Sequence, residues 1–304
     1  MSVAFAAVPV APGSKTMLPF EGARQAIVSW NSTAAEGEIR VRAFGRDGSA
    51  GERLRLARWS PAERRSFSER DAAIDVEVDI VRARVPISSL EIETEAPLDL
   101  LAMTTCDERV EARPHGGRAI DLPVPPRSQF PDDLASVPPR LARSARGWCS
   151  AASLAMVLEY YGRPMTLVEV ASRVFDSAFG GTGNWSFNVA FAGSLGFRAH
   201  VAYLRDLRAA EEFVARGIPL AVTYSWRRGD LPGAPQAESS GHFSVLRGFD
   251  ALGNPLLNDP AQPALRAAYP RSAFEAVWLR HGGVAYVVAP PEEVSVAGEF
   301  AASA

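Results

Sequence analysis

The chain contains 304 residues, of which 47% are hydrophobic and 22% are charged, and its formal net charge is −3. This composition is typical of a globular protein, and the length leaves room for about two domains of ordinary size. The interspersed charges argue against a nucleic-acid partner or a membrane surface, and the absence of an apolar run of about 18 residues argues against membrane insertion.

The sequence from about residue 20 to residue 106 is typical of β-strands. Short segments alternate between apolar and polar residues, as in strands with one buried face, and clusters of Gly, Pro, Asn, Asp and Ser separate them. Strands at this spacing predict an all-β sandwich, and none of its residues suggests a reaction centre. The predicted strands cover residues 26–30, 38–44, 54–59, 74–80, 84–87, 90–94 and 98–103.

Changes in composition divide the chain into two domains with flanking segments. We expect an N-terminal extension at 1–18, the β-sandwich at 19–107, a linker rich in Pro, Gly and Arg at 108–122, a second domain at 123–292 and a flexible tail at 293–304. The extension lacks the basic leading region of a secretion signal, so a cytoplasmic location is the default expectation.

The second domain begins with helices and ends with strands, which predicts an α+β domain. A capping box at Thr166–Glu169 starts one helix, and Asn184 and Asp206 precede two others. Alternating segments predict strands at 220–224, 242–249, 255–258 and 284–288.

A cysteine stands at the start of the first predicted helix, at 149–162. In this position the free N–H groups and the helix dipole favour a thiolate, and a neighbouring His can lower the pKa from about 8.5 to roughly 3.5–7.5. The sequence therefore makes Cys149 a candidate nucleophile, whereas we expect Cys106, at the end of a strand, to be a buried small hydrophobe. The apolar residues of the helix have the spacing of an amphipathic helix: Leu154, Val157, Leu158 and Tyr161.

Only one of the four histidines has the context of a general base for this thiol. We expect His115 and His281 to be solvated surface groups and His200 to be structural. His242 follows a glycine and opens a strand, and the turn at 250–254 returns the chain towards it. Asn258 and Asp259 close the returning strand. Since the start of one hairpin strand faces the end of the next, one of these two residues should orient the imidazole.

Gln129 lies in a proline-rich stretch 20 residues before the cysteine. Its side-chain amide and the backbone N–H of Cys149 could supply the two donors of an oxyanion hole.

Four segments in this order resemble the papain-like cysteine peptidases of the C39-like group, which are related to the domains that trim double-glycine leader peptides from bacteriocins. The segments are Val124-Pro125-x-x-Ser128-Gln129, Trp148-Cys149-Ser150-Ala151-Ala152-Ser153-Leu154-Ala155-Met156-Val157-Leu158-x-Tyr160-Tyr161-Gly162, Gly241-His242-Phe243-Ser244-Val245-x-x-Gly248-Phe249-Asp250 and Asn258-Asp259-Pro260.

The resemblance implies a papain-like second domain and a role for each matching residue. Cys149 would be the nucleophile, His242 the general base, Asp259 the orienting residue in preference to Asn258, and Gln129 the oxyanion donor. We expect most relatives in this group to be exported, so secretion is an alternative to a cytoplasmic location. The transporter and ATPase segments of the leader peptidases have no counterpart here, so double-glycine specificity is not carried over.

Trp148, Trp185 and Asn258 are candidates for substrate contact, and core packing is an alternative role for Trp185 and for Trp226. The segment at 227–238, rich in Pro and Gly, precedes His242 and could be a lid over the cleft or an ordinary solvated loop.

The expected reaction is the cleavage of a peptide or isopeptide bond in a peptide or protein substrate, with no metal or organic cofactor. The β-sandwich could bind a polymer or a protein. Two other functions remain open: a thiol-dependent amidase or acyl transferase on the same fold, and a binding protein with an inactive peptidase-like scaffold.

Overall fold

The computed structural model describes residues 2–6, 9–20, 22–106, 113–133, 135, 137–142, 144 and 147–291. The expected tail at 293–304 lies outside the described residues, as do parts of the expected N-terminal extension and linker. The chain divides into two compact units. The first comprises Met1–Glu108, Phe175–Val201 and Pro290–Ala304, and the second comprises Arg109–Val174 and Ala202–Ala289.

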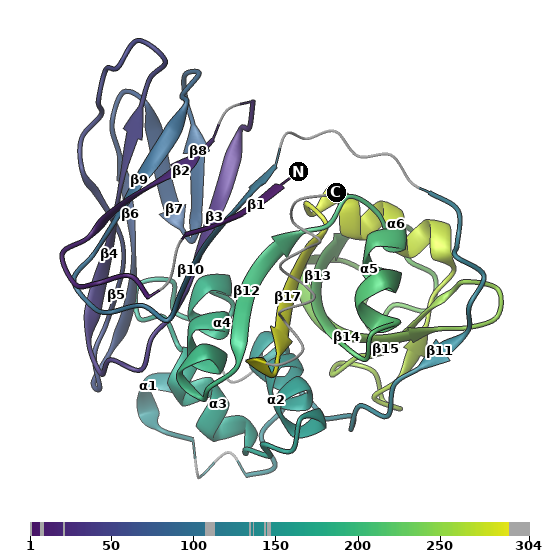
Figure 1. Cartoon of the computed structure of the whole chain (residues 1–304). Helices are drawn as coiled ribbons and strands as arrows, with labels where there is room; N and C mark the ends of the chain where they lie inside the picture. The colour runs from purple at the N-terminus through teal and green to yellow at the C-terminus, as the bar shows by residue number, and fades with distance from the viewer. Residues whose placement is uncertain are drawn as a thin grey trace. The chain divides into compact units, whose positions relative to one another are not determined.

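The first unit is built on a ten-stranded sheet (Figure 1, purple to blue). The strand order is β1-β10-β3-β8-β7-β6-β5-β4-β9-β2, and the end strands β1 and β2 contact each other, so the sheet is nearly closed. The strands are β1 (Ser2–Phe5), β2 (Lys15–Pro19), β3 (Gln25–Asn31), β4 (Gly37–Phe44), β5 (Leu54–Trp59), β6 (Arg64–Arg70), β7 (Ile74–Val78), β8 (Ile80–Ala83), β9 (Ser89–Thr94) and β10 (Leu100–Cys106).

This sheet confirms the predicted β-rich N-terminal part, with local differences. The strand expected at 74–80 is a tight hairpin, because Val78 adopts a positive φ of 61° and divides it into β7 and β8. No strand covers the described residues 84–87, and β6 was not predicted. The ten strands form one continuous path of neighbours, where a sandwich would have two separate sheets.

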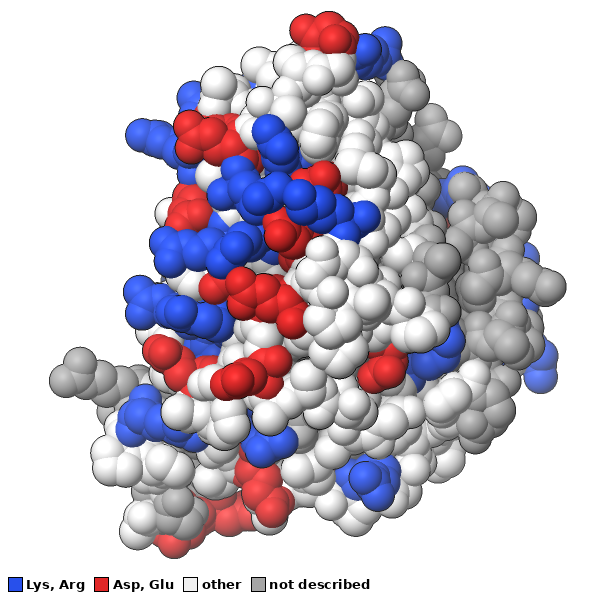
Figure 2. All heavy atoms as spheres, turned by 60° about the vertical axis from the view of Figure 1, so that its left-hand side comes forward, with Lys and Arg blue, Asp and Glu red and all other residues white. Residues whose placement is uncertain are grey.

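Basic and acidic side chains alternate over one face of this sheet (Figure 2). They pair within and across strands because opposite charges on neighbouring strands attract each other. Glu38 and Arg40 lie 2.6 Å apart, and Arg53 lies 2.6 Å from Glu93. The alternation leaves no extended field of one sign on this face.

Helix α4 (Trp185–Ser194) packs against β3 and belongs to the first unit. Its Phe187 is 1% exposed in the hydrophobic core and meets Trp30 edge-on, with 6.0 Å between the ring centroids. Asn31 donates from Nδ2 to the carbonyl of Ala199 at 2.9 Å and accepts from the amide of Ala199 at 3.0 Å. These contacts, which include a pair 168 residues apart in the sequence, explain why a distant segment is part of the β-rich unit.

The second unit combines helices with an antiparallel sheet (Figure 1, teal to yellow). The sheet order is β12-β17-β13-β14-β15-β16, with β11 paired to β14, and the chain passes from the first unit to the second within β12. The elements are β11 (Ile120–Asp121), α1 (Pro139–Ala142), α2 (Cys149–Tyr160), α3 (Leu167–Val174), β12 (Arg198–Tyr203), α5 (Leu207–Val214), β13 (Leu220–Trp226), β14 (Ser239–Phe249), β15 (Pro255–Asn258), β16 (Ala267–Ala268), α6 (Arg271–Arg280) and β17 (Val284–Ala289).

The helix starts follow the predicted caps. Thr166 and Glu169 form the capping box, with Oγ1 and Oε2 2.8 Å apart, and Asn184 and Asp206 accept from the amides three residues further on at 3.0 and 2.8 Å. Among the described residues, none of the helices combines the length and the apolar character needed to cross a membrane.

Helix α2 is the central helix of the second unit. It contacts α3, β13 and β14, and all nine residues from 150 to 158 are buried. The expectation of an amphipathic helix is therefore wrong, because neighbouring elements cover the helix on its polar-looking side as well, where small residues allow close packing.

The described part of the expected linker, residues 113–122, belongs to the second unit. Residues 120–121 pair with β14, and His115 Nδ1 lies 2.7 Å from a carboxylate oxygen of Glu211 on α5. His115 also packs near Phe249, so the expectation of a solvated histidine is wrong. The hydrogen bond and the strand pairing hold this segment against the unit.

Candidate active site

Cys149 is the first residue of α2, as the sequence predicts, and its side chain is partly exposed. Trp148 caps the helix and accepts a hydrogen bond from the amide of Ala152 at 2.8 Å. The amides of the first helical turn have no carbonyl partners within the helix, so their N–H groups favour negative charge at the sulfur.

His242 lies in β14 and is 3% exposed. Its side chain is hydrogen-bonded to Cys149, and the backbone amides of Phe243 and Ser150 also donate to the sulfur. Burial raises the pKa of Cys149, but the hydrogen bond and the charge of His242 and the two amides lower it more, so the pKa lies below the usual thiol value. The structure therefore favours a thiolate at this position.

Asp259 follows β15 at the end of the predicted hairpin. The turn closes with a hydrogen bond from the amide of Gly253 to the carbonyl of Asp250 at 3.0 Å. The returning strand brings Asp259 to His242, with 2.7 Å between Oδ1 and Nε2. Since Nε2 is engaged by the carboxylate, Nδ1 is left for the thiol.

The histidine is held as a cation between two groups that carry negative charge. Burial lowers the pKa of His242, but its hydrogen bonds to Asp259 and Cys149 and their charges raise it to about 10. Burial likewise raises the pKa of Asp259, but the hydrogen bond and charge of His242 outweigh it and lower the pKa. The thiolate, the imidazolium and the carboxylate thus stabilise one another.

Gln129 is brought beside this group by its backbone. Its amide donates to the carbonyl of Pro260 at 3.1 Å, next to Asp259 in the sequence. The contribution of its side chain to an oxyanion hole stays a prediction.

Three residues were expected to contact substrate: Trp148, Asn258 and Trp185. Trp148 is fully buried and its Nε1 donates to Ser144 Oγ at 3.2 Å, and Asn258 is fully buried and its Nδ2 donates to the carbonyl of Val124 at 2.8 Å. Both side chains are packed in the interior, and their contact with substrate stays a prediction. Trp185 starts α4 in the first unit, where its amide donates to Asp79, and its role in substrate binding stays a prediction.

Three aromatic residues surround the histidine and the carboxylate: Tyr224 and Tyr269 were missed as site residues, whereas Trp226 was expected either at the wall of the cleft or in the core. The hydroxyls of Tyr224 and Tyr269 lie 3.2 and 3.0 Å from Asp259 Oδ2. Trp226 meets the ring of His242 edge-on, with 5.7 Å between the centroids. The spacing of Tyr224 and Trp226 places both on one face of a strand, but only the paired strands show which residues that face meets.

The segment at 227–238, the expected lid or solvated loop, is fastened at three points. Trp226 Nε1 donates to the carbonyl of Gln236 at 3.0 Å, and Gln262 Nε2 donates to the carbonyl of Gly233 at 2.6 Å. Asp230 pairs with Arg280 at 2.5 Å. The segment is therefore ordered next to the histidine, while a lid function stays a prediction.

Three further candidates of the sequence remain, of which His281 lies close to Gly241, the residue before His242. His200 is buried, and burial together with Arg198 lowers its pKa to about 4, in agreement with the expected structural role. Cys106 is 3% exposed, as expected for a small hydrophobe. His281 caps the C-terminus of α6 and is half-buried, and burial lowers its pKa, so it is not the solvated group that we expected.

Comparison with known proteins identifies a family and a similar solved structure. A sequence model of the Peptidase C39 like family matches residues 121–286. A comparison with curated proteins found no match. Among solved structures, a candidate C39-like peptidase from Bacillus anthracis is 19% identical, with a TM-score of 0.41, and the alignment covers 57% of this chain and 98% of the other.

The matched segment contains Gln129, Cys149, His242 and Asp259 and extends over more than half of the sequence. The chain therefore belongs to the Peptidase C39 like family.

Proposed function

We propose that the protein is a cysteine peptidase that cleaves peptide or isopeptide bonds. The observation that carries this proposal is the continuous arrangement of Cys149, His242 and Asp259 within one compact unit. The thiol is hydrogen-bonded to the imidazole, and the imidazole lies 2.7 Å from the carboxylate. A nucleophile, a base and a group that orients the base are the parts that acyl transfer to a side chain requires.

In the first half of the reaction, the Cys149 thiolate attacks the carbonyl carbon, and the carbonyl electron pair moves to the oxygen. The backbone N–H of Cys149 and the side-chain amide of Gln129 donate to this oxyanion. When the carbon–nitrogen bond breaks, His242 transfers its proton to the leaving amine.

In the second half, a water molecule attacks the thioester while His242 accepts a proton from it. The carbon–sulfur bond breaks, and the thiolate and imidazolium are restored. Asp259 keeps its charge throughout and stabilises the imidazolium.

The elements that carry these groups support a papain-like arrangement. The nucleophile starts helix α2, the base lies on the antiparallel strand β14, and α2 packs against that strand. We propose peptides or proteins as substrates, and a polymer or a protein as ligand of the β-rich unit.

The test is hydrolysis of a diverse peptide library, with products identified by mass spectrometry. We expect wild type to cleave, and Cys149→Ala and His242→Ala to lose at least about 10³-fold in kcat/KM. Cys106→Ala removes the other thiol and should retain the activity of wild type. Cleavage by Cys149→Ala at the rate of wild type would overturn the proposal.

An amine-bearing probe in the same assay separates hydrolysis from acyl transfer. We expect hydrolysed product in its presence. Conjugation of the probe as the main product would instead show an acyl transferase that uses the same thiol.

A further inference from the structure

The carboxylate of Asp259 is fully buried and accepts four hydrogen bonds. Oδ1 accepts from His242 Nε2 at 2.7 Å and from the amide of Ala261 at 3.0 Å. Oδ2 accepts from the hydroxyls of Tyr224 at 3.2 Å and Tyr269 at 3.0 Å. An ionised carboxylate has about four acceptor positions, and the protein occupies all of them without water.

Each tyrosine hydroxyl is itself held by a second donor. Tyr224 lies 2.8 Å from Ser244 Oγ, and because the Tyr224 proton points to Asp259, the serine must donate. Gln262 Nε2 donates to the Tyr269 oxygen at 3.2 Å. Two chains of hydrogen bonds therefore converge on Oδ2, and donors in such chains strengthen one another.

Both tyrosines remain neutral donors. Tyr224 is fully buried and Tyr269 is 1% exposed. Burial, followed by the charge of Asp259, raises the pKa of each hydroxyl above its usual value of 10.0. Neither hydroxyl gives up its proton in the pH range where the peptidase would work.

We propose that Tyr224 and Tyr269 are positioning residues, which fix the plane of Asp259 and keep its carboxylate ionised in a site that water does not reach. If Asp259 were protonated, its own hydrogen would point at one of the four donor groups. The hydrogen-bond network therefore favours the ionised carboxylate. The consequence for catalysis rests on the proposed function, because the carboxylate acts only through His242.

Removal of the Tyr224 and Tyr269 hydroxyls should change the charge state of the site while the fold is retained. In the Tyr224→Phe/Tyr269→Phe double variant Oδ2 loses both donors while Oδ1 keeps its two, and a buried carboxylate with fewer hydrogen bonds has a raised pKa. Once Asp259 is neutral, His242 loses the anion that stabilises its cation. The pair with Cys149 then shifts from thiolate and imidazolium towards thiol and neutral imidazole.

The direct measurement is the titration of the Asp259 carboxyl carbon by NMR, in protein labelled with ¹³C at the aspartate carboxyls and assigned with Asp259→Asn. We expect this carbon to stay in its ionised position in wild type down to the lowest pH at which the protein is folded. In the Tyr224→Phe/Tyr269→Phe double variant its titration midpoint should move up by about one pH unit or more.

Tyr160→Phe is the matched control, because the Tyr160 hydroxyl donates to the carbonyl of Gly217 at 3.0 Å, at the other end of α2. The Asp259 carboxyl carbon of Tyr160→Phe should titrate as that of wild type does. A double variant whose Asp259 carbon behaves as in wild type would overturn the inference.

Alkylation of Cys149 by iodoacetamide, followed by mass spectrometry, shows the effect on the thiol. We expect the double variant to react about tenfold more slowly than wild type at about pH 5 and within about twofold of it at about pH 8. An equal loss at both pH values would show general loosening and would contradict a positioning role. An unreactive Cys149 in wild type would contradict the proposed peptidase function, while the carboxyl titration would still decide the role of the tyrosines.

Discussion

His242 carries a positive charge in a place where burial alone would remove it. The carboxylate of Asp259 and the sulfur of Cys149 stabilise the imidazolium more than burial destabilises it, and they raise its pKa to about 10. The same cation lowers the pKa of Cys149. The charges of Cys149, His242 and Asp259 therefore depend on one another, and the three groups titrate as a unit.

This coupling predicts a broad pH profile of kcat/KM. As the pH falls through the lowered pKa of Cys149, the thiolate is protonated and activity is lost. As the pH rises towards about 10, His242 loses the proton that the leaving amine needs, and activity is lost again. The measurement is kcat/KM against pH with a short peptide substrate. An alkaline limb near the usual histidine pKa would mean that the imidazole is not stabilised as a cation.

A second prediction concerns Gln129. If its side chain stabilises the oxyanion, Gln129→Ala should lower kcat by about 10²–10³-fold with little change in KM, because the interaction forms only in the transition state. Gln236→Ala, at an exposed glutamine of segment 227–238, is the control and should have the kinetics of wild type. Equal kinetics of Gln129→Ala and wild type would remove this residue from the site.

The sequence predicted the proximity of Cys149, His242 and Asp259 because each lies where local structure is strongly specified. A helix start, a strand start and a hairpin end can all be recognised from neighbouring residues. Tyr224 and Tyr269 were not predicted, because their approach to Asp259 depends on the pairing of β13 with β14 and on the course of the chain after β15. The burial of Trp148 and Asn258 was not predicted for the same reason, since burial is a property of the packed structure.

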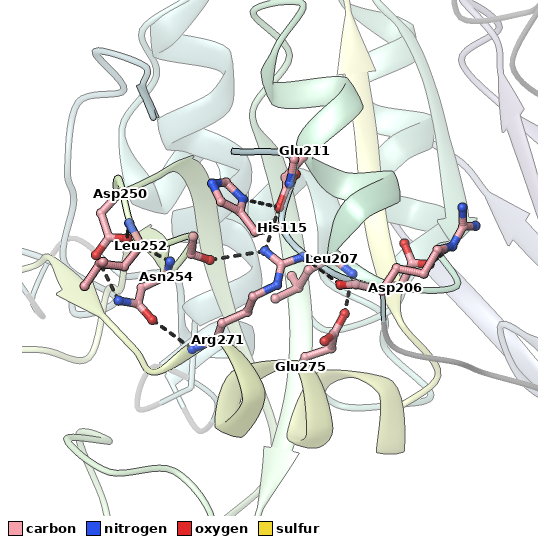
Figure 3. Close-up of polar contacts among 12 residues, drawn as sticks. His115, Asp206, Leu207, Glu211, Asp250, Leu252, Asn254, Arg271 and Glu275 are labelled. Atoms are coloured by element: carbon pink, nitrogen blue, oxygen red, sulfur yellow. Dashed lines mark hydrogen bonds and ion pairs between the residues drawn. The ribbon is translucent and has the colours of Figure 1, made fainter. Parts of the chain in front are cut away.

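At the scale of elements, helices α5 and α6 are fastened to each other and to residues 113–116 by a cluster of charges (Figure 3). Glu211 on α5 accepts from Arg271 Nη1 at 2.6 Å, from the amide of Gly116 at 2.7 Å, and lies 2.7 Å from His115 Nδ1. Glu275 on α6 accepts from the first amide of α5, that of Leu207, at 2.8 Å. These contacts link three segments that are distant in the sequence.

This cluster predicts a difference between two arginines of α6. Arg271→Ala leaves Glu211 without its strongest partner in a largely buried position and should lower the free energy of unfolding by about 1–3 kcal/mol. Arg280, whose side chain is 49% exposed, pairs with Asp230. Arg280→Ala should therefore change the free energy of unfolding by less than about 1 kcal/mol. Urea denaturation measures both. Equal stabilities of the two variants would show that the cluster contributes nothing specific.

The helices with side-chain caps were predicted within one or two residues, because the caps are local hydrogen bonds that the sequence displays. Helix α6 was missed, since it follows Pro270 and has no side-chain cap. The burial of α2 was misjudged, because its alanines and serines look polar or neutral in a sequence pattern while they allow close packing against β13 and β14.

At the scale of the whole chain, the first unit is not continuous in the sequence. Residues 175–201 complete it through α4, whose Phe187 lies in its core. The sequence predicted two domains in linear order, and no local pattern could show that the pair Asn31 and Ala199, 168 residues apart, joins these segments.

A chain shortened to residues 109–291 should therefore fold poorly. It would keep α4 without the strands that bury Phe187, which is 1% exposed in the full chain, and would expose apolar surface. We expect aggregation or a less cooperative thermal transition than that of the full chain, measured by light scattering and calorimetry. A monomeric shortened chain that unfolds in one sharp transition would show that the β-rich unit does not need α4 on the same chain.

The most direct test of the account is the titration of the Cys149 thiolate by its ultraviolet absorbance, taken as the difference between wild type and Cys149→Ala. We predict that wild type shows a thiolate below the usual thiol pKa of 9.0, and that the thiolate of His242→Ala appears at higher pH than in wild type, because only the two backbone amides then oppose burial. The same ordinary alkaline titration in wild type and in His242→Ala would contradict the account.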